Sequence, residues 1–410
     1  MSLREDPDHR EWLDAECRRL LSFGARVVHP LGGAAWLDDH GSPEPQRGIQ
    51  TWITARTVHV NSLGVLLGVP GSAELAAGAL AGLVGPLHDA EHGGWFTAAT
   101  SDGSPDRAAG KSAYHHAFVM LAASSGVLAG IDGAGALLEE AEAVFEERFW
   151  DDAAGGCVDR WDDAWQRADD YRGLNGTMHA VEAMLAVADV TGRTTWRERA
   201  ARVADLVVDL AHAHDGRLPE HFDASWTPDL ELNRDRPADP FKPFGATIGH
   251  ALEWSRLLLD LEAALGPAAP ASLLPTAVLL FDRAVTDGWA SDGAPGFVYT
   301  TDWDGRPVVR ARMHWVAAEA VAAAATLHQR TGEASYDDHY RTWWHYIANH
   351  VIDLLAGSWH HELDPDNRPA ASVWPGKPDL YHAVQATLLP RLPLAPSLAS
   401  AVRAGALRAM

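Results

Sequence analysis

Apolar residues along this chain recur at helical spacing, and strand-like alternation is scarce. Stretches rich in alanine and leucine carry the pattern, for example residues 73–84, 136–149, 181–190 and 251–265. Alanine and leucine have high helix propensity, and apolar positions three or four residues apart predict helices with one buried face. The sequence therefore predicts a mostly α-helical protein.

Glycine turns separate these stretches at a nearly regular interval. They fall at Gly32-Gly33, Gly93-Gly94, Gly155-Gly156, Gly216, Gly296 and Gly357. The steps between their first members are 61, 62, 61, 80 and 61 residues. An interval of about 60 residues suits two helices and their connections, so six such units predict about twelve helices.

Six helix pairs can close into a ring or stack as an open solenoid. An open solenoid needs a distinct polar cap at each end, and the sequence shows no clear cap. We therefore predict an all-α (α/α)6 barrel over residues 1–410, a single domain whose inner helices line a central cavity. The stretch from Leu389 to the end, rich in proline and then in small apolar residues, is expected to pack against it.

Composition and charge restrict the partners of this protein. Hydrophobic residues make up 47% of the 410 residues, with 17 tryptophans, which is ample material for a core. The net charge of −23, from 33 basic and 56 acidic residues, would repel nucleic acid and anionic membranes and mildly disfavours anionic small molecules. We expect no nucleic-acid or membrane partner.

The cysteines and the N-terminus favour the cytoplasm. Cys17 and Cys157 are the two cysteines of the chain, too few for a disulfide scaffold or a cysteine-based metal site. The N-terminal residues are charged from position 4 onward, and the chain has no run of about 18 apolar residues. We therefore expect a cytoplasmic protein; the sequence leaves a homo-oligomer open.

One otherwise apolar helical segment in each unit contains embedded polar or aromatic residues. These residues are Arg56; Tyr114 and His115; Asn175, His179 and Glu182; His250 and Glu253; Trp315 and Glu319; and Lys377, Tyr381 and His382. From Arg56, the steps to His115, His179, His250, Trp315 and His382 are 59, 64, 71, 65 and 67 residues. A single buried histidine is more often structural than functional, but this periodic set predicts a shared site on the ring axis.

Two pairs within this set share a helix face. His250 and Glu253 are three residues apart, and Asn175 and His179 are four apart. A carboxylate beside a histidine fixes its tautomer and raises its pKa, as general acid/base chemistry near neutral pH requires. We therefore expect Glu253 to orient His250.

Metal and nucleotide motifs are weak, and we expect no cofactor. The segment from His88 to His92 has histidines four apart but not the HExxH order, and no carboxylate-rich cluster is evident. The segment 103–112 resembles a phosphate-binding loop, but Pro105 stands where such a loop needs glycine. Of the adjacent pairs His115-His116 and His360-His361, at most one member each can point inward.

Seven short motifs in a fixed order carry a family resemblance. They are Gly93-Gly94-Trp95, Gly103–Phe118, Leu174–Ala183, Gly249–Trp254, Trp315–Ala320, Gly357–Asp364 and Lys377–His382. In this order they resemble the N-acylglucosamine 2-epimerase superfamily over nearly the whole chain. The texts HPLGGAAWLDDHG, TWITARTVHV and WPGKPDLYH are more similar to its mannose isomerase and sulfoquinovose isomerase branch than to the cellobiose 2-epimerases.

The resemblance implies aldose–ketose isomerisation of a monosaccharide, without metal, through an enediolate. The implied reaction interconverts D-mannose and D-fructose, with D-lyxose and D-xylulose as a further pair. The alternatives are a sulfoquinovose isomerase, a 2-epimerase of a free sugar or disaccharide, a hydrolase or lyase on the same toroid, and a non-catalytic carbohydrate-binding toroid.

The resemblance also implies residue roles. It places Tyr114, Asn175, His179 and Trp315 in the sugar pocket with Arg56, His250, Glu253 and His382, and ranks Glu319 and Lys377 second. Our hypothesis is that His382 moves the C2 proton to C1, Arg56 stabilises the enediolate, and His250 assists ring opening; the two histidines could exchange roles. The charged, proline-rich loop 233–244 is expected to cover the cavity.

Overall fold

The computed structural model describes residues 2–405 and 407. The expectation for the C-terminal stretch can therefore be followed only within that range, because residues 406 and 408–410 lie outside the described residues. Within it, α13 (Leu398–Arg403) packs against the ends of α2, α4 and α6 and buries Ala399, Ala401 and Val402. The expected packing of this stretch is confirmed for these residues.

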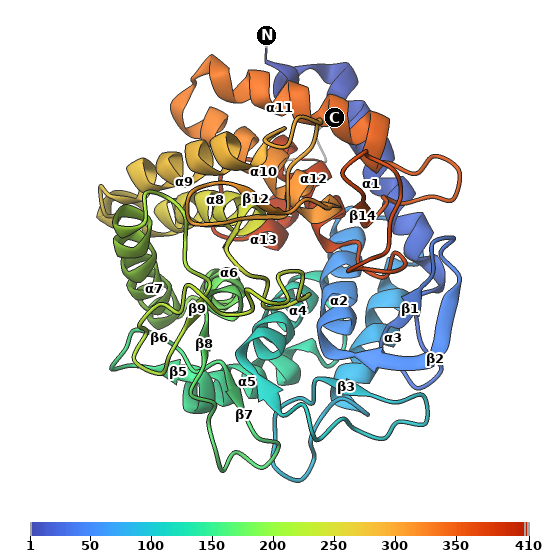
Figure 1. The fold of residues 1–410 in the computed structure, drawn as a ribbon. Coiled ribbons are helices and arrows are strands. Elements are labelled where there is room, and N and C mark those ends of the chain that lie inside the picture. Colours follow the sequence, from blue (N-terminus) through green and yellow to red (C-terminus); the bar gives the residue numbers. More distant parts are fainter. Residues whose placement is uncertain (1, 406, 408–410) are drawn as a thin grey trace.

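Six inner helices form a closed ring. They are α2 (Thr51–Leu66), α4 (Ala113–Ala129), α6 (Leu174–Thr191), α8 (Ile248–Leu265), α10 (His314–Thr331) and α12 (Tyr381–Leu388). Each packs against the next, and α12 packs against α2, which closes the ring (Figure 1). The predicted (α/α)6 barrel is confirmed, and the open solenoid is excluded.

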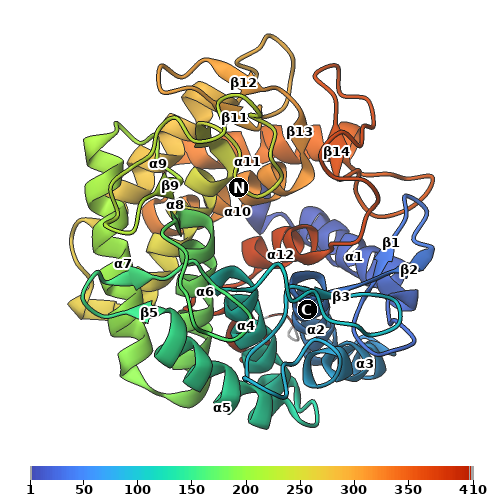
Figure 2. The ribbon, with the colours of Figure 1, turned by 60° about the horizontal axis from the view of Figure 1, so that its bottom comes forward.

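Six outer helices cover the ring. They are α1 (Pro7–Phe23), α3 (Ser72–Val84), α5 (Ala134–Val144), α7 (Thr194–Ala213), α9 (Leu273–Gly288) and α11 (Ala334–Tyr346). Five of them pack on the inner helix that precedes them, whereas α1 packs on α12. The two ends of the chain thus form the sixth hairpin, as Figure 2 shows where α12 lies beside α1 and α2.

Burial separates the two rings as the apolar pattern predicts. In α2, every residue from Thr51 to Gly64 is buried, so polar side chains in it face other protein groups. In α7, burial is confined to Trp196, Ala200, Val203, Ala204, Val207, Leu210 and Ala211, one stripe of an amphipathic helix. A polar residue in an inner helix therefore either completes a buried network or faces the central cavity.

Short strands, which the sequence analysis did not predict, join neighbouring hairpins at one end of the ring. They are β1 (Ala35–Leu37), β2 (Pro43–Gln50), β3 (Ala98–Ala99), β4 (Lys111–Ser112), β5 (Trp150–Asp151), β6 (Gly156–Cys157), β7 (Arg160–Trp161), β8 (Arg172–Gly173), β9 (His221–Phe222), β10 (Ala246–Thr247), β11 (Thr300–Thr301), β12 (Pro307–Val309), β13 (Arg312–Met313) and β14 (Glu362–Leu363). Most span two or three residues, too few to leave an alternating pattern. The pairs β2–β3, β4–β7, β8–β9, β10–β11 and β13–β14 are antiparallel.

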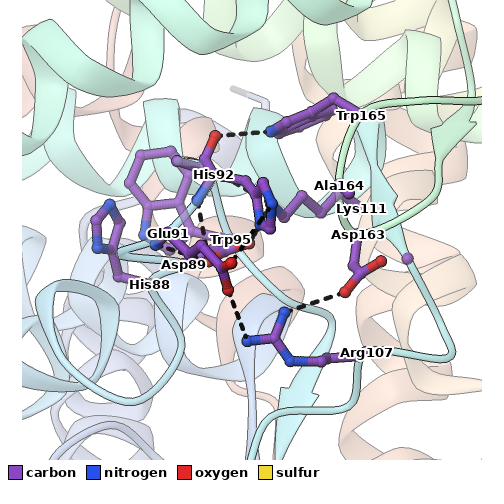
Figure 3. A network of polar contacts seen from close by, with 12 residues as sticks. His88, Asp89, Glu91, His92, Trp95, Arg107, Lys111, Asp163, Ala164 and Trp165 are labelled. Atoms are coloured by element: carbon purple, nitrogen blue, oxygen red, sulfur yellow. Dashed lines mark hydrogen bonds and ion pairs between the residues drawn. The ribbon is translucent and has the colours of Figure 1, made fainter.

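Each predicted glycine turn follows an outer helix. Gly93 and Gly357, for example, adopt φ values of 77° and 96°, which L side chains rarely adopt. In both turns a buried lysine donates hydrogen bonds to a glycine carbonyl and to an aspartate at the start of the turn. Lys111 Nζ lies 2.7 Å from the Gly93 carbonyl and 2.6 Å from Asp89 (Figure 3). These contacts tie the turn to the strand that leads into the next inner helix.

Candidate active site

A cavity of about 690 Å³ opens at the end of the ring where the inner helices begin. Its wall includes residues of the inner helices: Trp52, Arg56, Tyr114, Asn175, His179, His250, Glu253, His314, Trp315 and His382. Most of these lie in the first or second turn of their helix because the short strands bring all the helix starts to one end. A lining of aromatic rings with a few polar side chains is typical of a small-molecule site.

His382 is held by a buried carboxylate of the neighbouring inner helix. Its Nδ1 lies 2.8 Å from Oε1 of Glu319, so Nδ1 donates and Nε2 remains the basic nitrogen. Burial, and next the charge of Arg56, lower the pKa of His382 well below its usual value. His382 is therefore neutral at pH 7, and its pKa is lowered, not raised as expected for a histidine beside a carboxylate, because burial dominates.

The carboxylate that orients His250 is Glu220, not Glu253. His250 Nδ1 lies 2.9 Å from Oε1 of Glu220, a buried residue next to β9. The prediction that Glu253 orients His250 is wrong because Glu253, three residues along α8, turns toward His179 and Arg256 instead. Spacing on one helix could not reveal a partner from the next connection.

Trp315 stands between the two histidines. Its ring centroid lies 5.2 Å from that of His250 and 5.6 Å from that of His382, with interplanar angles of 34° and 36°. Trp315 also meets Tyr299 edge to face. The two histidine–glutamate pairs thus flank one aromatic surface, which suits the apolar face of a sugar.

Arg56 is a fixed cation at the cavity wall. Its Nη1 donates to Asp379 and its Nη2 lies 3.3 Å from the Tyr114 hydroxyl, while the guanidinium lies over the rings of Phe118 and Tyr381. Burial opposes the charge, but Asp379 and the tyrosines outweigh burial and raise the pKa of Arg56 above its ordinary value. Asp379, which the sequence analysis did not single out, therefore sets the position of this cation.

A group of buried carboxyls lies beneath the cavity, which corrects the expectation that no carboxylate-rich cluster exists. Glu253 has no hydrogen-bond partner for either oxygen within the described residues. Burial, and next the charge of Glu319, raise the pKa of Glu253 well above its usual value, so Glu253 is a neutral acid. Burial likewise raises the pKa of Asp260 to about 7, although Arg256 opposes this.

Arg256 supplies the positive charge in this cluster. It lies 3.2 Å from Glu319, 3.0 Å from Asp260 and 3.6 Å from Glu253. Two groups of three side chains are close enough to hold a metal ion, namely His179 with Glu182 and Glu253, and Glu253 with Glu319 and His382. Arg256 already contacts Glu253 and Glu319, the two carboxyls of the second group. Its guanidinium therefore supplies there the positive charge that a metal ion would bring.

A loop covers the cavity, as expected for residues 233–244. Pro240, Phe241 and Pro243 line the cavity. The Phe241 ring lies 5.4 Å from that of Trp374 and 6.3 Å from that of Trp52, both edge to face. Phe241 is 44% exposed, so it closes the cavity from the solvent side.

The comparisons with known proteins agree with this geometry. The profile of the N-acylglucosamine 2-epimerase (GlcNAc 2-epimerase) family matches residues 32–386. This chain belongs to the N-acylglucosamine 2-epimerase family. It is 53% identical over 396 residues to the D-mannose isomerase of Thermobifida fusca, with 96% of this chain and 97% of that protein covered.

Two further relatives extend this family assignment. The D-mannose isomerase of Pseudomonas cannabina pv. alisalensis is 49% identical over 97% of this chain and 96% of its own length. A crystal structure of a D-mannose isomerase superposes with a TM-score of 0.84 at 25% identity, covering 93% of this chain and 97% of that one.

None of the helices in the described part of this family member is long and apolar enough to cross a membrane.

The structure brings most of the predicted site residues together in this epimerase-family pocket. The cavity wall includes Arg56, Tyr114, Asn175, His179, His250, Glu253, Trp315 and His382. Glu319 lies behind the wall and contacts the cavity residue His382. Of the two adjacent histidine pairs, His361 alone lines the cavity, which agrees with the limit of one inward histidine per pair.

Lys377 does not line the cavity, so its position does not support direct sugar binding. Its Nζ lies 2.6 Å from Asp353 and 2.9 Å from the Gly357 carbonyl. These contacts repeat those of Lys111 with Asp89 and Gly93 in the second unit (Figure 3). Lys377 therefore fixes a glycine turn, a role that its place in a family motif could not reveal.

The sequence analysis missed a second periodic set in this family member. The first amide of α2, α4, α6, α8 and α10 donates to the carbonyl of Thr97, Asp159, Glu220, Tyr299 and His361, respectively. These residues follow the glycine turns by three or four positions, with steps of 62, 61, 79 and 62 residues. The glycine interval could have identified Glu220, Tyr299 and His361 as neighbours of the site.

Proposed function

We propose that this protein is an aldose–ketose isomerase that converts D-mannose into D-fructose. The observation that carries the proposal is the pair of oriented histidines, His250 and His382, on either side of Trp315 in a covered cavity. The names of the relatives at about half identity point to the same substrate.

The isomerisation needs one proton moved from C2 to C1 and another moved from O2 to O1. We assign the first transfer to His382, whose Nε2 is basic because Nδ1 donates to Glu319. His382 takes the C2 proton and returns it to C1 on the same face of the intermediate. His250, oriented by Glu220, moves the proton between the two oxygens and assists ring opening.

The enediolate carries negative charge, and the cavity offers three ways to stabilise it. Arg56 is held in place by Asp379 and faces the cavity as a preorganised donor. Glu253 is a neutral acid that can donate a hydrogen bond. The starts of the inner helices converge on the cavity, and their dipoles favour negative charge there.

We also propose that catalysis requires no metal. Arg256 contacts Glu253 and Glu319 and supplies the charge that a metal would otherwise supply to that cluster. The enediolate stabilisation described above likewise uses only side chains and helix starts. Residual activity after complete chelation is the measurement that decides this point.

The test is to incubate EDTA-treated protein with D-mannose in deuterated water and to follow the products by NMR. Fructose with solvent deuterium at C1 is the expected product. Glucose as the main product would instead assign the protein to the 2-epimerases, and loss of activity that returns with a divalent metal would refute metal independence. His88→Asn, in a partly exposed histidine that contacts Glu140 outside the cavity, is the control variant and should retain full activity.

A further inference from the structure

Two histidines that the mechanism does not use lie side by side in the cavity wall. His314 begins α10, and His361 precedes β14 on the next connection. The β13–β14 pairing continues through the His314 amide, which donates to the His361 carbonyl at 3.1 Å. The two rings are therefore stacked, with centroids 4.0 Å apart and an interplanar angle of 8°.

Backbone contacts fix the tautomer of both rings. His314 Nδ1 lies 3.2 Å from the His361 carbonyl oxygen, which can only accept, so Nδ1 carries the hydrogen. The His361 ring donates to the backbone of Asp379. Burial lowers the pKa of His314 to about 4, and burial together with His314 lowers the pKa of His361 well below its usual value. Both rings are therefore neutral near pH 7.

The remaining nitrogens are unused acceptors. Nε2 of His314 and Nε2 of His361 are buried and have no hydrogen-bond partner among the described residues. In these tautomers each Nε2 is a bare lone pair, and burying two of them unpaired is costly. Both residues line the cavity, so a bound molecule can satisfy them.

A metal ion is a poor occupant of this pair. The groups of three side chains that could hold a metal, among the residues the structure describes, include neither histidine. A sulfonate or a doubly charged phosphate is equally unsuitable because its oxygens bring no hydrogen to a bare acceptor.

We propose that His314 and His361 form a paired acceptor for two hydroxyl groups of the sugar and so select a neutral polyhydroxy substrate. The inference rests on the proposed function in that a sugar occupies this cavity. It also separates this protein from isomerases of sulfonated or phosphorylated sugars, for which acceptor-only groups in this position would be unfavourable. The histidines act in specificity and take no part in proton transfer.

Deoxyfluoro sugars test this pairing because fluorine occupies the place of a hydroxyl but cannot donate a hydrogen bond. D-mannose analogues fluorinated at C3, C4 or C6 would be compared with D-mannose by kcat/KM. In the wild-type protein we expect fluorination at one or two of these positions to lower kcat/KM about 10-fold or more. In His314→Leu or His361→Leu, fluorination at the same positions should lower kcat/KM by less than about 3-fold because the acceptor is already missing.

Matched variants guard against a merely structural effect. His314→Gln and His361→Gln place an amide oxygen near the former Nε2. In these variants fluorination should again lower kcat/KM, by much of the factor seen in the wild-type protein. Thermal unfolding of each variant checks that it folds. An unchanged positional loss in both leucine variants would overturn the proposal, as would efficient turnover of a 6-phosphorylated or 6-sulfonated sugar by the wild-type protein.

Calorimetry with D-mannitol separates this inference from the proposed function. Mannitol has no carbonyl group and cannot be isomerised, so its binding reports on the acceptors alone. We expect affinity to fall about 10-fold in the leucine variants and to be largely kept in the glutamine variants. If mannose is not turned over but this binding pattern is observed, the proposed isomerase function is refuted and the paired acceptor is supported. If mannitol binds all variants with equal affinity, the paired acceptor is refuted.

Discussion

The two histidine–glutamate pairs of the cavity look alike but are built differently. His250 is oriented by Glu220, which comes from the connection before β9 and forms no ion pair with any other side chain among the described residues. His382 is oriented by Glu319 on the adjacent inner helix, and Glu319 also binds Arg256 in the buried carboxyl cluster. The Glu220–His250 pair stands apart from the buried carboxyl cluster, whereas the Glu319–His382 pair shares its glutamate with Arg256 in that cluster.

This difference shows that two similar histidine–glutamate pairs in one ring of helices can respond differently to substitution. A change at Glu220 alters the contact with His250 and no other ion pair among the described residues. A change at Glu319 alters the balance of Arg256, Asp260 and Glu253, all of which are buried. We therefore expect the His382 pair to affect folding as well as catalysis, and the His250 pair to affect catalysis alone.

The largest effect should separate the roles of the two histidines. His382→Asn removes the base, so exchange of the C2 proton with solvent should fall by about 10³-fold or more. His250→Asn should slow net isomerisation but leave detectable C2 exchange. NMR of D-mannose in deuterated water measures both rates. Retained exchange in His382→Asn together with lost exchange in His250→Asn would mean that the two roles are reversed.

Substituting the two glutamates tests the difference directly. Glu319→Gln removes a charge that balances Arg256 in the core and should lower the free energy of unfolding by about 3 kcal/mol, with loss of activity. Glu220→Gln keeps an acceptor for His250 and should reduce kcat about 10-fold with little change in stability. Denaturant unfolding and kcat would be measured for both. Equal stability losses would contradict the proposed difference between the pairs.

Comparing Lys377 with Lys111 tests whether Lys377 acts at the site near His382 or only fixes its glycine turn. Lys377→Met and Lys111→Met each break a buried ion pair and should destabilise the protein by about 3 kcal/mol. Burial alone would raise the pKa of Asp353, but the bonds from Lys377 and backbone amides outweigh it and hold that pKa at about 2. The stabilisation from Asp353 is thus present above its unfolded pKa and lost as pH falls toward 2.

The stability difference between Lys377→Met and the wild type should therefore narrow below about pH 4, as urea unfolding at several pH values would show. The Lys111→Met variant is the matched control, because Lys111 makes the same turn contacts in the second unit and does not line the cavity. If Lys377→Met raised KM strongly and Lys111→Met did not, Lys377 would have a role at the site beyond its turn.

The smallest effect should come from the covering loop, whose Phe241 side chain packs against aromatic rings. Phe241→Ala removes the contacts with Trp52 and Trp374 and should raise KM for mannose about 5-fold, with unchanged thermal stability. C2 exchange and net isomerisation should be affected equally. A selective effect on one of these rates would show that the loop positions one histidine rather than covering the cavity.

Much of the site could be predicted because its residues interrupt a clear pattern. Arg56, His179, His250 and His382 stand out as polar groups in apolar inner helices, and their spacing matches the interval of the glycine turns. The loop 233–244 could be placed over the cavity because it is rich in charge and proline and comes just before His250. The inference about the helix residues needed only the helical period and the repeat.

The partners of these residues could not be predicted in the same way. Glu220, Glu319 and Asp379 reach their partners across 30, 63 and 323 residues of chain. Helix geometry predicts Glu253 as the partner of His250, but in the structure Glu253 lies beside Arg256 and His179. Lys377 lies in a family motif, yet its contacts are those of a turn lysine.

The sequence by itself determined the helices, their number of repeats and which helix of each pair is buried, because helical period and burial are properties of neighbouring residues. The tertiary structure decided which carboxylate orients each histidine, which carboxyl is neutral and which histidines remain bare acceptors. Those properties depend on distances and desolvation between segments that meet only when the ring closes.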